Sequence, residues 1–369
     1  MIKVCHMTSV HGPEDGRIFH KECVSLAKAG YDVYLVERSG SYEKSGVHIV
    51  GIGEVPANRL KRMTESVQKV YKEAKALDAD IYHIHDPELL PCGLKLKKAG
   101  KKVIFDSHEK YIEQIAVKPY LPRPAAAMIS KIYGTYETFV LRQLDAVIFP
   151  CTIQGKNPFE GKCRRAILLN NVPLPEELFT EETVEKPDFK AGYAGGIRPD
   201  RGSRQNVMAC EQANVPLVLA GEPSSQEFRK ELETLDPKHL VTFLGKVDRP
   251  GVWKMLAGIS VGLVTELNVG QNHILGNLPT KAYEYMAAGI PFLISRYPYA
   301  EEVVNRYHCG ICVDPENVEE AVKALSFLRS HPEEARQMGE NGRRAVREEF
   351  NWGVEEQKLL ALYEDILKN

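Results

Sequence analysis

Short apolar runs alternate with longer amphipathic stretches along this chain of 369 residues, and the alternation comes in two successive series. In the first series the apolar runs predict strands at Ile2–Thr8, Asp32–Glu37, Val47–Ile52, Ile81–His85, Val103–Asp106, Ala146–Pro150 and Ala166–Leu169. The stretches between them predict helices at Gly16–Ala29, Pro56–Leu77, Glu88–Ala99 and Ala125–Gln143. This rhythm predicts a parallel sheet with helices on both faces.

The second series begins after residues 173–187, which hold three prolines and no periodicity, as is typical of a linker. Its strands are predicted at Phe189–Tyr193, Leu217–Ala220, Val241–Leu244, Val261–Thr265, Pro291–Ile294 and Ile311–Val313. The chain is too long for one typical core, so we predict two domains, residues 1–172 and 188–352. A last helix, within residues 353–369, is expected to pack back on the first domain. Doubly wound sheets bind ligands at the carboxyl ends of their strands, so two facing domains would hold a site in the cleft between them.

Composition excludes several classes of protein. The hydrophobic share of 43% and the formal charge of -2 are typical of a soluble protein and argue against a nucleic-acid partner. The sequence has no run of 18 apolar residues and opens directly on a predicted strand, so we expect a cytoplasmic protein. Its eight cysteines are scattered, which fits a reduced compartment. Cys309 and Cys312 form one C-x-x-C pair, but a structural zinc site usually needs a second pair.

The segment from Gly276 to Pro291 points most directly to a ligand. Lys281 and Glu284 lie one helical turn apart at the start of a predicted helix, and Pro279 suits its first turn. Charged side chains beside free helix N–H groups suit a ligand that carries hydroxyls and phosphates. The alternative is a surface helix whose charged residues face water.

A glycine turn opens the second series. Gly195 and Gly196 follow its first strand, and Arg201 precedes a helix that begins near Ser203. Glycines let a diphosphate approach the backbone, and arginine can bind phosphate oxygens with two N–H groups. Gly12 lies in the corresponding turn of the first series. Both turns also fit ordinary surface loops.

Two neighbouring strand ends in the first series are rich in histidine and acid. Alternation places His83 and His85 on one face of their strand, while Asp106 and His108 close the next. A polar pocket for substrate binding or acid–base chemistry is expected at this edge. Metal binding by His85, Asp86 and His108 is an alternative, and a core position is favoured for His83. The candidates for acceptor contact are His11, His85, Asp86 and Glu109.

Basic residues concentrate in the first series, at Arg59, Lys61, Arg62, Lys95, Lys97, Lys98, Lys101, Lys102, Lys118 and Arg123. Solvated helix faces explain most of them. The further expectation is peripheral contact with an anionic membrane, aided by Tyr120 and Leu121.

Taken together, these motifs resemble glycosyltransferase family 4, whose members have the GT-B fold of two facing Rossmann-like domains. The resemblance covers nearly the whole chain. It rests on the His-x-His-Asp and Asp-Ser-His-Glu strand ends, Leu169–Pro173, Gly195-Gly196 with Arg201-Gly202, Phe243–Val247 and Pro279–Pro291. It implies an α/β fold with an acceptor-binding first domain and a donor-binding second domain.

Residue by residue, the resemblance implies a donor site and a catalytic group. Glu284 would hold the ribose of the donor, Arg201 would replace the usual phosphate-binding lysine, and His108 would lie near the transferred sugar. The implied donor site comprises Gly12, Gly195, Gly196, Arg201, Lys246, Val247, Pro279, Thr280, Lys281 and Glu284. Two positions depart from the family pattern. Gly276 stands where a second glutamate is common, and Gly196 where an arginine is common, so Arg198 or Arg204 would have to substitute.

The resemblance implies a retaining glycosyltransferase that moves a sugar from a nucleotide diphosphate, expected to be UDP, to an acceptor hydroxyl. The acceptor would be a glycan or a lipid-linked glycan of the cell surface, reached at the inner face of the membrane. No cofactor and no metal are expected, because Arg201 and helix N–H groups can stabilise the departing diphosphate. The alternatives are a nucleotide-sugar 2-epimerase of the same fold and a nucleotide-sugar-binding protein without turnover.

Overall fold

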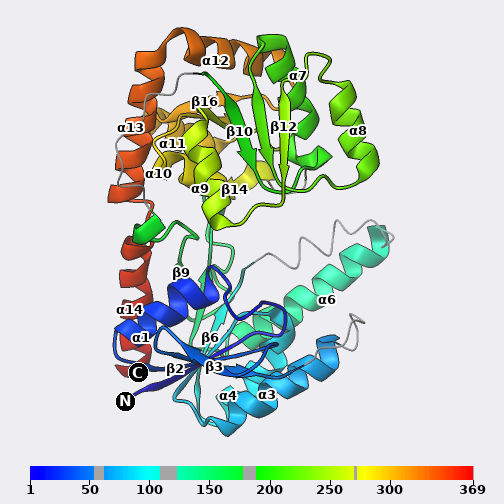
Figure 1. Ribbon diagram of the computed structural model, residues 1–369. Helices are drawn as coiled ribbons and strands as arrows, with labels where there is room; N and C mark the ends of the chain where they lie inside the picture. Colours follow the sequence, from blue (N-terminus) through cyan, green and yellow to red (C-terminus); the bar gives the residue numbers. More distant parts are fainter. Residues whose placement is uncertain (54–61, 109–122, 178–187, 270–271, 369) are drawn as a thin grey trace. The chain divides into compact units, whose positions relative to one another are not determined.

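The computed structural model describes residues 1–53, 62–108, 123–177, 188–269 and 272–368 (Figure 1). It divides into two compact units, each described by itself below. The first unit comprises residues 1–152, 156–171 and 353–369, and the second comprises residues 153–155 and 172–352. Several positions singled out from sequence lie outside the described residues: Arg59, Lys61, Glu109, Lys118, Tyr120, Leu121 and most of the predicted linker. None of the helices in the described part of the chain is both long and apolar enough to span a membrane.

The first unit is built on an eight-stranded sheet in the order β3-β4-β2-β1-β5-β6-β7-β9. Neighbouring strands run parallel except β3 and β4, which are antiparallel. The strands are β1 (Lys3–Met7), β2 (Asp32–Glu37), β3 (Tyr42–Lys44), β4 (Val47–Gly51), β5 (Ile81–Ile84), β6 (Lys102–Asp106), β7 (Ala146–Phe149) and β9 (Ala166–Leu168). All seven predicted strands are confirmed. Only β3, whose residues are all exposed, is additional.

Helices follow most of these strands. They are η1 (Ile18–Cys23), α1 (Val24–Lys28), η2 (Arg62–Ser66), α3 (Val67–Ala76), η3 (Pro87–Leu89), α4 (Leu90–Lys98), α6 (Arg123–Leu141) and α14 (Trp352–Lys368). From Gly353 on, α14 belongs to the first unit. There Glu355 accepts hydrogen bonds from the backbone and side-chain nitrogens of Asn170, both at 3.0 Å.

The second unit has a six-stranded parallel sheet in the order β12-β11-β10-β13-β15-β16. Its strands are β10 (Ala191–Ala194), β11 (Leu217–Ala220), β12 (Val241–Gly245), β13 (Val261–Val264), β15 (Phe292–Ser295) and β16 (Gly310–Val313). Its helices are η4 (Pro175–Glu177), η5 (Pro199–Arg201), α7 (Ser203–Ala213), α8 (Gln226–Thr234), α9 (Arg249–Gly258), η6 (Asn272–Ile274), α10 (Thr280–Ala287), α11 (Pro298–Tyr307), α12 (Val318–Ser330) and α13 (Pro332–Glu348). The short strands β8 (Thr152–Ile153) and β14 (Leu275–Gly276) form a separate two-stranded sheet. The prediction of two parallel-sheet α/β domains is therefore confirmed.

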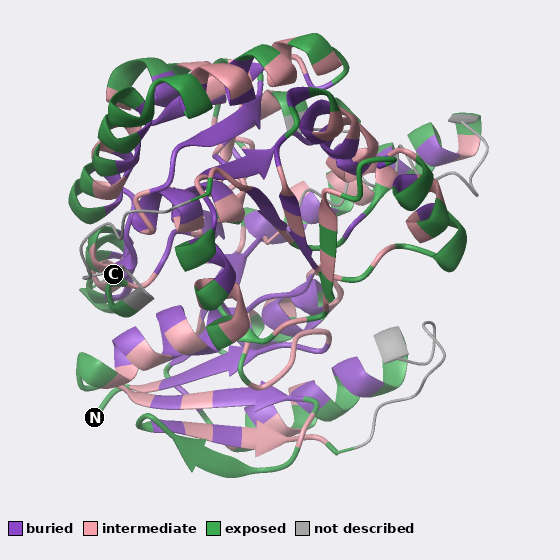
Figure 2. Ribbon diagram, turned by 45° about the horizontal axis from the view of Figure 1, so that its top comes forward, coloured by how far each residue is buried: buried purple, intermediate pink, exposed green. Residues whose placement is uncertain are grey.

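Burial follows the expected pattern, with the central strands buried and the outer helix faces exposed (Figure 2). In each sheet the strand order reverses direction once along the chain. The reversal lies between β1 and β5 in the first unit and between β10 and β13 in the second. Loops diverge at such a reversal, which leaves room for a ligand at the carboxyl ends of the strands. These two edges hold the candidate site residues.

Candidate active site

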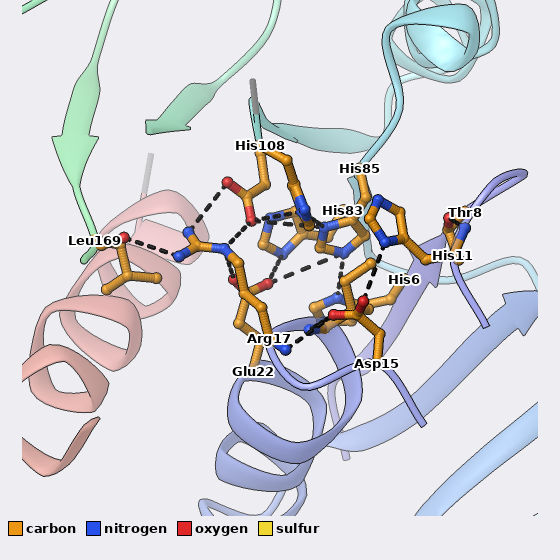
Figure 3. Close-up of polar contacts among 12 residues, drawn as sticks. His6, Thr8, His11, Asp15, Arg17, Glu22, His83, His85, His108 and Leu169 are labelled. Atoms are coloured by element: carbon orange, nitrogen blue, oxygen red, sulfur yellow. Dashed lines mark hydrogen bonds and ion pairs between the residues drawn. The ribbon is translucent and has the colours of Figure 1, made fainter. Parts of the chain in front are cut away.

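The carboxyl ends of β1, β5 and β6 are adjacent in the first unit and gather the predicted histidines into one buried cluster (Figure 3). His6 on β1 stacks with His85 just after β5, with ring centroids 5.1 Å apart. His83 and His85 also stack, at 4.6 Å, as expected for residues on one face of a strand. His108 follows β6 and meets His85 edge to face, at 5.2 Å.

A hydrogen-bonded chain connects these rings. His108 Nε2 lies 3.1 Å from His85 Nδ1, and His85 Nε2 lies 2.9 Å from His6 Nδ1. The hydroxyl of Tyr363, on α14, lies 3.4 Å from His6 Nε2 and 2.9 Å from His83 Nδ1. Burial lowers the pKa of His85 to about 4 and those of His6 and His83 well below their usual value, so these three rings are neutral at pH 7.

One guanidinium and two carboxylates lie beneath the rings. Arg17 Nε is 2.8 Å from Asp106 Oδ2 and 3.0 Å from Glu22 Oε1, and all three side chains are buried. Burial raises the pKa of Glu22 well above its usual value, and Asp106 adds to the effect. Burial would also raise the pKa of Asp106, but Arg17 and His108 hold it well below its usual value. Asp106 is therefore the more readily ionised of the two carboxyls.

The turn after β1 supplies the more accessible groups. His11 is partly exposed and lies with its ring centroid 4.8 Å from that of His108. A hydrogen bond to Asp15, at 3.1 Å, raises the pKa of His11. Asp86 is buried and accepts hydrogen bonds from the Thr8 hydroxyl at 2.9 Å and from the Ser9 backbone N–H at 2.6 Å.

Of the four candidates for acceptor contact, only His11 is accessible among the described residues. His85 and Asp86 are 1% and 2% exposed, so neither side chain is open to a ligand. Glu109 lies outside the described residues.

The cluster also holds residues with the chemistry of metal ligands. Ligand atoms of His6, Glu22, His83 and His85 lie within 4.8 Å of one another. Two nitrogen ligands of a tetrahedral zinc ion stand roughly 3.3 Å apart, given bonds of about 2.0–2.1 Å. His6 Nδ1 and His85 Nε2 are closer, at the 2.9 Å of a hydrogen bond. The arrangement is therefore that of a hydrogen-bonded network, and the expectation of metal-independent transfer stays a prediction.

In the second unit a buried carboxylate holds two cations between the ends of β10 and β13. Glu266, which follows β13, contacts Arg201 and Lys281 through its Oε1 atom, at 2.8 Å in the case of Lys281. Burial would raise the pKa of Glu266, but Lys281 and Arg201 lower it, so the carboxylate is ionised at neutral pH. Sequence reasoning missed Glu266, although it directly follows a predicted strand whose end faces the site.

A pocket of about 240 Å³ lies beside this cluster, lined in part by Arg201, Glu266, Asn277 and Pro279. The helix α10 begins at its edge. Pro279, the N-cap residue, makes no side-chain cap hydrogen bond, and its carbonyl accepts from the N–H of Ala282 at 2.9 Å. The N-terminus of a helix favours an anion. The pocket thus combines one guanidinium, one carboxylate and a helix N-terminus, and Lys281 contacts the same carboxylate.

Glu284 lies one turn into α10 and pairs with Arg249 of α9. Glu284 is largely buried, whereas Arg249 is exposed and lies over the ring of Trp253, 4.7 Å from its centroid. Sequence reasoning also missed Arg249, because its contact with Glu284 spans 35 positions.

The remaining predicted donor residues belong to the second unit, except Gly12. The Tyr193 hydroxyl donates to Gly196 O at 3.0 Å, and a Cβ on Gly195 would meet that ring. The backbone of Lys246 donates to Glu222, while Val247 packs on the core of the unit. Thr280 is exposed. Gly12 belongs to the first unit, in a turn with open space around it.

The two arginines expected to substitute at Gly196 are engaged elsewhere. Arg198 pairs with Asp200, and Arg204 pairs with Glu231 of α8. Neither contacts Glu266 among the described residues, whereas Arg201 does.

Comparisons with known proteins identify the family. The model of "Glycosyltransferase Family 4" matches residues 16–154, and the model of "Glycosyl transferases group 1" matches residues 176–345. The chain is also 38% identical over 299 residues to the MMP alpha-(1->4)-mannosyltransferase of Mycolicibacterium hassiacum, which covers 76% of this chain and 70% of that protein. The chain belongs to glycosyltransferase family 4. This family 4 glycosyltransferase is accordingly an enzyme, which argues against the protein without turnover. The matching family models and the relative are described as transferases, which favours transfer over the 2-epimerase.

Solved structures support the GT-B fold of this glycosyltransferase. Sucrose-phosphate synthase from Thermosynechococcus elongatus aligns over 100% of both chains with a TM-score of 0.77 and 16% identity. The Anabaena protein HepE, solved in complex with UDP and glucose, aligns over 99% of this chain and 100% of its own with a TM-score of 0.70 and 14% identity. At such identities the likeness concerns the fold alone.

Proposed function

We propose that this glycosyltransferase moves a hexosyl group, with retention of configuration, from a nucleoside diphosphate donor to an acceptor hydroxyl. The donor binds to the second unit. The observation that carries this assignment is the cluster of Arg201, Lys281 and Glu266 beside the N-terminus of α10. Two cations and a helix N-terminus form an anion site that suits a diphosphate.

The diphosphate would take over the cations that Glu266 now neutralises. Arg201 binds phosphate oxygens through its guanidinium, and Lys281 adds a point charge at the first turn of α10. Glu284 accepts the ribose hydroxyls once they displace Arg249. As the bond between the sugar and the diphosphate breaks, the negative charge that develops on the leaving group meets preorganised positive charge.

The acceptor binds to the first unit. There His11, in the turn from Thr8 to Asp15, and His108, at the end of β6, can hydrogen-bond to its hydroxyl groups. His108 is the catalytic candidate because its side chain is 16% exposed and is backed by an ionised carboxylate, Asp106, 3.2 Å away. Gly12 leaves the backbone of the turn accessible.

The relatives point to two different donors. HepE was solved with UDP and with UDP-glucose, which supports the expected UDP, whereas the Mycolicibacterium relative is a mannosyltransferase. Incubation with UDP-glucose, UDP-galactose and GDP-mannose, each with a panel of α-hexosides and lipid extract, separates these donors. We expect one α-linked product, identified by the coupling of its anomeric proton. A β-linked product would contradict retention, and free isomerised donor would indicate an epimerase.

Transfer without a metal ion is part of the proposal, since Arg201, Lys281 and the start of α10 supply the positive field. Activity after dialysis against EDTA should equal the untreated activity. Loss on chelation and recovery with magnesium or manganese would contradict this.

A lipid-linked acceptor and contact with an anionic membrane are also proposed. Two of the lysines behind this expectation are occupied, because Lys97 pairs with Asp145 at 2.6 Å and Lys101 with Asp78 at 2.7 Å. The helix α6 adds an exposed apolar stripe that includes Met128, Ile132 and Phe139, each at least 60% exposed. Apolar and basic groups on one unit suit the interface of a membrane.

Sedimentation with anionic vesicles at low salt tests this contact. Replacing Met128, Ile132 and Phe139 by serine should abolish binding, whereas Lys230→Glu, on an exposed face of α8 in the second unit, should not. Absence of vesicle binding by the unaltered protein would mean that the acceptor is soluble.

A further inference from the structure

The hydrogen-bonded chain in the first unit has a direction, and that direction follows from its one ionised member. Asp106 can only accept hydrogen bonds, because Arg17 keeps it ionised. Its Oδ2 atom lies 3.2 Å from His108 Nε2 but 3.6 Å from His85 Nδ1. A carboxylate favours the proton on the nearer nitrogen, so His108 carries its hydrogen on Nε2.

Each later link is then fixed, since a neutral imidazole has one N–H and one lone pair. His85 accepts from His108 at Nδ1 and donates from Nε2 to His6 Nδ1. His6 donates from Nε2 to the Tyr363 hydroxyl, which donates to His83 Nδ1. The last proton lies on His83 Nε2, which is buried and has no partner among the described residues.

We infer that this relay sets the tautomer of His108, leaving Nδ1 as the unprotonated nitrogen that meets the substrate, and that His85, His6 and Tyr363 are positioning residues for it. The proposal rests on the proposed function in one respect, namely that His108 serves transfer. In that step the acceptor hydroxyl, on the face of the sugar from which the diphosphate departs, would give its proton to His108 Nδ1 while its oxygen bonds to the anomeric carbon, so that the configuration is retained. The bonding electrons to the old diphosphate oxygen leave with the diphosphate. The imidazolium that forms is stabilised by Asp106 at Nε2–H.

The same histidines could also carry hydrogen bonds that run in the opposite direction, from His83 to His108. If every proton moves to the other nitrogen of its ring, His108 carries hydrogen on Nδ1 and cannot accept a proton there. The groups that face the relay and bias this balance are His11 and Asp15 in the turn, Arg17 and Glu22 at η1, Asp86 after β5, Asp106 on β6 and Glu355 on α14. Tyr363 is the link whose loss most directly favours the opposite direction, because His6 Nε2–H then has no acceptor.

Ring nitrogens report their tautomer in ¹⁵N chemical shifts, so the full chain labelled at histidine tests the inference without any substrate. At pH 7.5 we expect a protonated Nε2 and an unprotonated Nδ1 for His108, assigned by comparison with His108→Asn. A protonated Nδ1 in the unaltered protein would overturn the inference by itself.

Tyr363→Phe should shift the tautomer ratio of His108 toward the Nδ1–H form by about fivefold, the equivalent of one neutral hydrogen bond. Where transfer is measured, kcat should fall by a similar factor with the KM for the donor unchanged. The matched control is Tyr82→Phe, which removes another buried tyrosine hydroxyl of the first unit, one that donates to Ala74 O at 3.2 Å. Equal effects of the two variants on His108 would overturn the positioning role. Absence of transfer in every variant would contradict the proposed function and leave the tautomer assignment intact.

Discussion

Replacing Glu266 by glutamine should destabilise the free enzyme and strengthen its binding of nucleoside diphosphates. The side chains of Glu266 and Lys281 are only 7% and 13% exposed, and their atoms meet at 2.8 Å. Removing one partner of a buried pair costs about 3–5 kcal/mol. We expect a smaller cost, about 2–3 kcal/mol, because Arg201 is 37% exposed and its share is screened by solvent.

A bound diphosphate supplies the negative charge that the variant lacks. Nucleotide binding should therefore restore most of the stability that the substitution removes. Since 1.4 kcal/mol corresponds to a factor of ten, the affinity for UDP or GDP should rise at least tenfold in Glu266→Gln. Urea unfolding with and without saturating nucleotide, together with titration calorimetry, measures both halves of the cycle. The stabilities of the variant and the unaltered protein should converge when nucleotide is saturating.

Glu231→Gln is the control for Glu266→Gln. Glu231 pairs with Arg204 at the exposed surface of the same unit, where an ion pair contributes little. It should change neither stability nor nucleotide affinity measurably. Weaker nucleotide binding in Glu266→Gln would refute the reasoning, because it would mean that the carboxylate contacts the donor directly.

Three further predictions concern single residues. Glu284→Ala should cost about 1.5–3 kcal/mol of nucleotide affinity through a lost charged hydrogen bond, whereas Arg249→Ala should not weaken binding, and calorimetry that ranks the two variants the other way would contradict the ribose assignment. His108→Ala should lower kcat by roughly a hundredfold while the nucleotide Kd stays the same, and a variant that unfolds instead would make His108 a structural residue. Acid should destabilise the protein. The pKa of His85 is about 4 in the folded protein and about 6.5 in the unfolded chain, so between these pH values only the unfolded chain takes up a proton. The free energy of unfolding in urea should therefore fall by about 3 kcal/mol from this group as the pH drops from 6.5 to 4, with His6 and His83 adding in the same direction, and a stability that rises on acidification would contradict neutral buried rings.

The strands were predictable because parallel sheets bury both faces and their strands read as short apolar runs. Strand β3 was not predictable in this way. It pairs antiparallel at the edge of its sheet, with every residue exposed, and so leaves no apolar signal. The helix α14 was predicted with nearly its observed bounds, but its contribution of Tyr363 to the histidine cluster was not.

The site was predictable as far as strand ends and glycine turns mark it. The sequence predicted His85 and His108 at the edge of one sheet and Arg201 and Lys281 at the edge of the other. In the structure His85 contacts His108, and Arg201 and Lys281 both contact Glu266. The sequence does not show locally which distant residues contact one another. Glu266 meets Arg201 across 65 positions, and Tyr363 meets His83 across 280. Such pairs depend on the order of strands in the sheet, which spacing along the chain does not reveal.

Titration of UDP and GDP into the unaltered protein, Arg201→Ala and Arg204→Ala tests most directly the claim that the second unit binds the donor diphosphate at the Glu266 cluster. The two arginines lie three positions apart, but only Arg201 reaches Glu266, while Arg204 pairs with Glu231. We predict that Arg201→Ala weakens the better nucleotide at least tenfold and that Arg204→Ala leaves its Kd unchanged. Equal losses in the two variants, or an unchanged Kd in Arg201→Ala, would contradict the account.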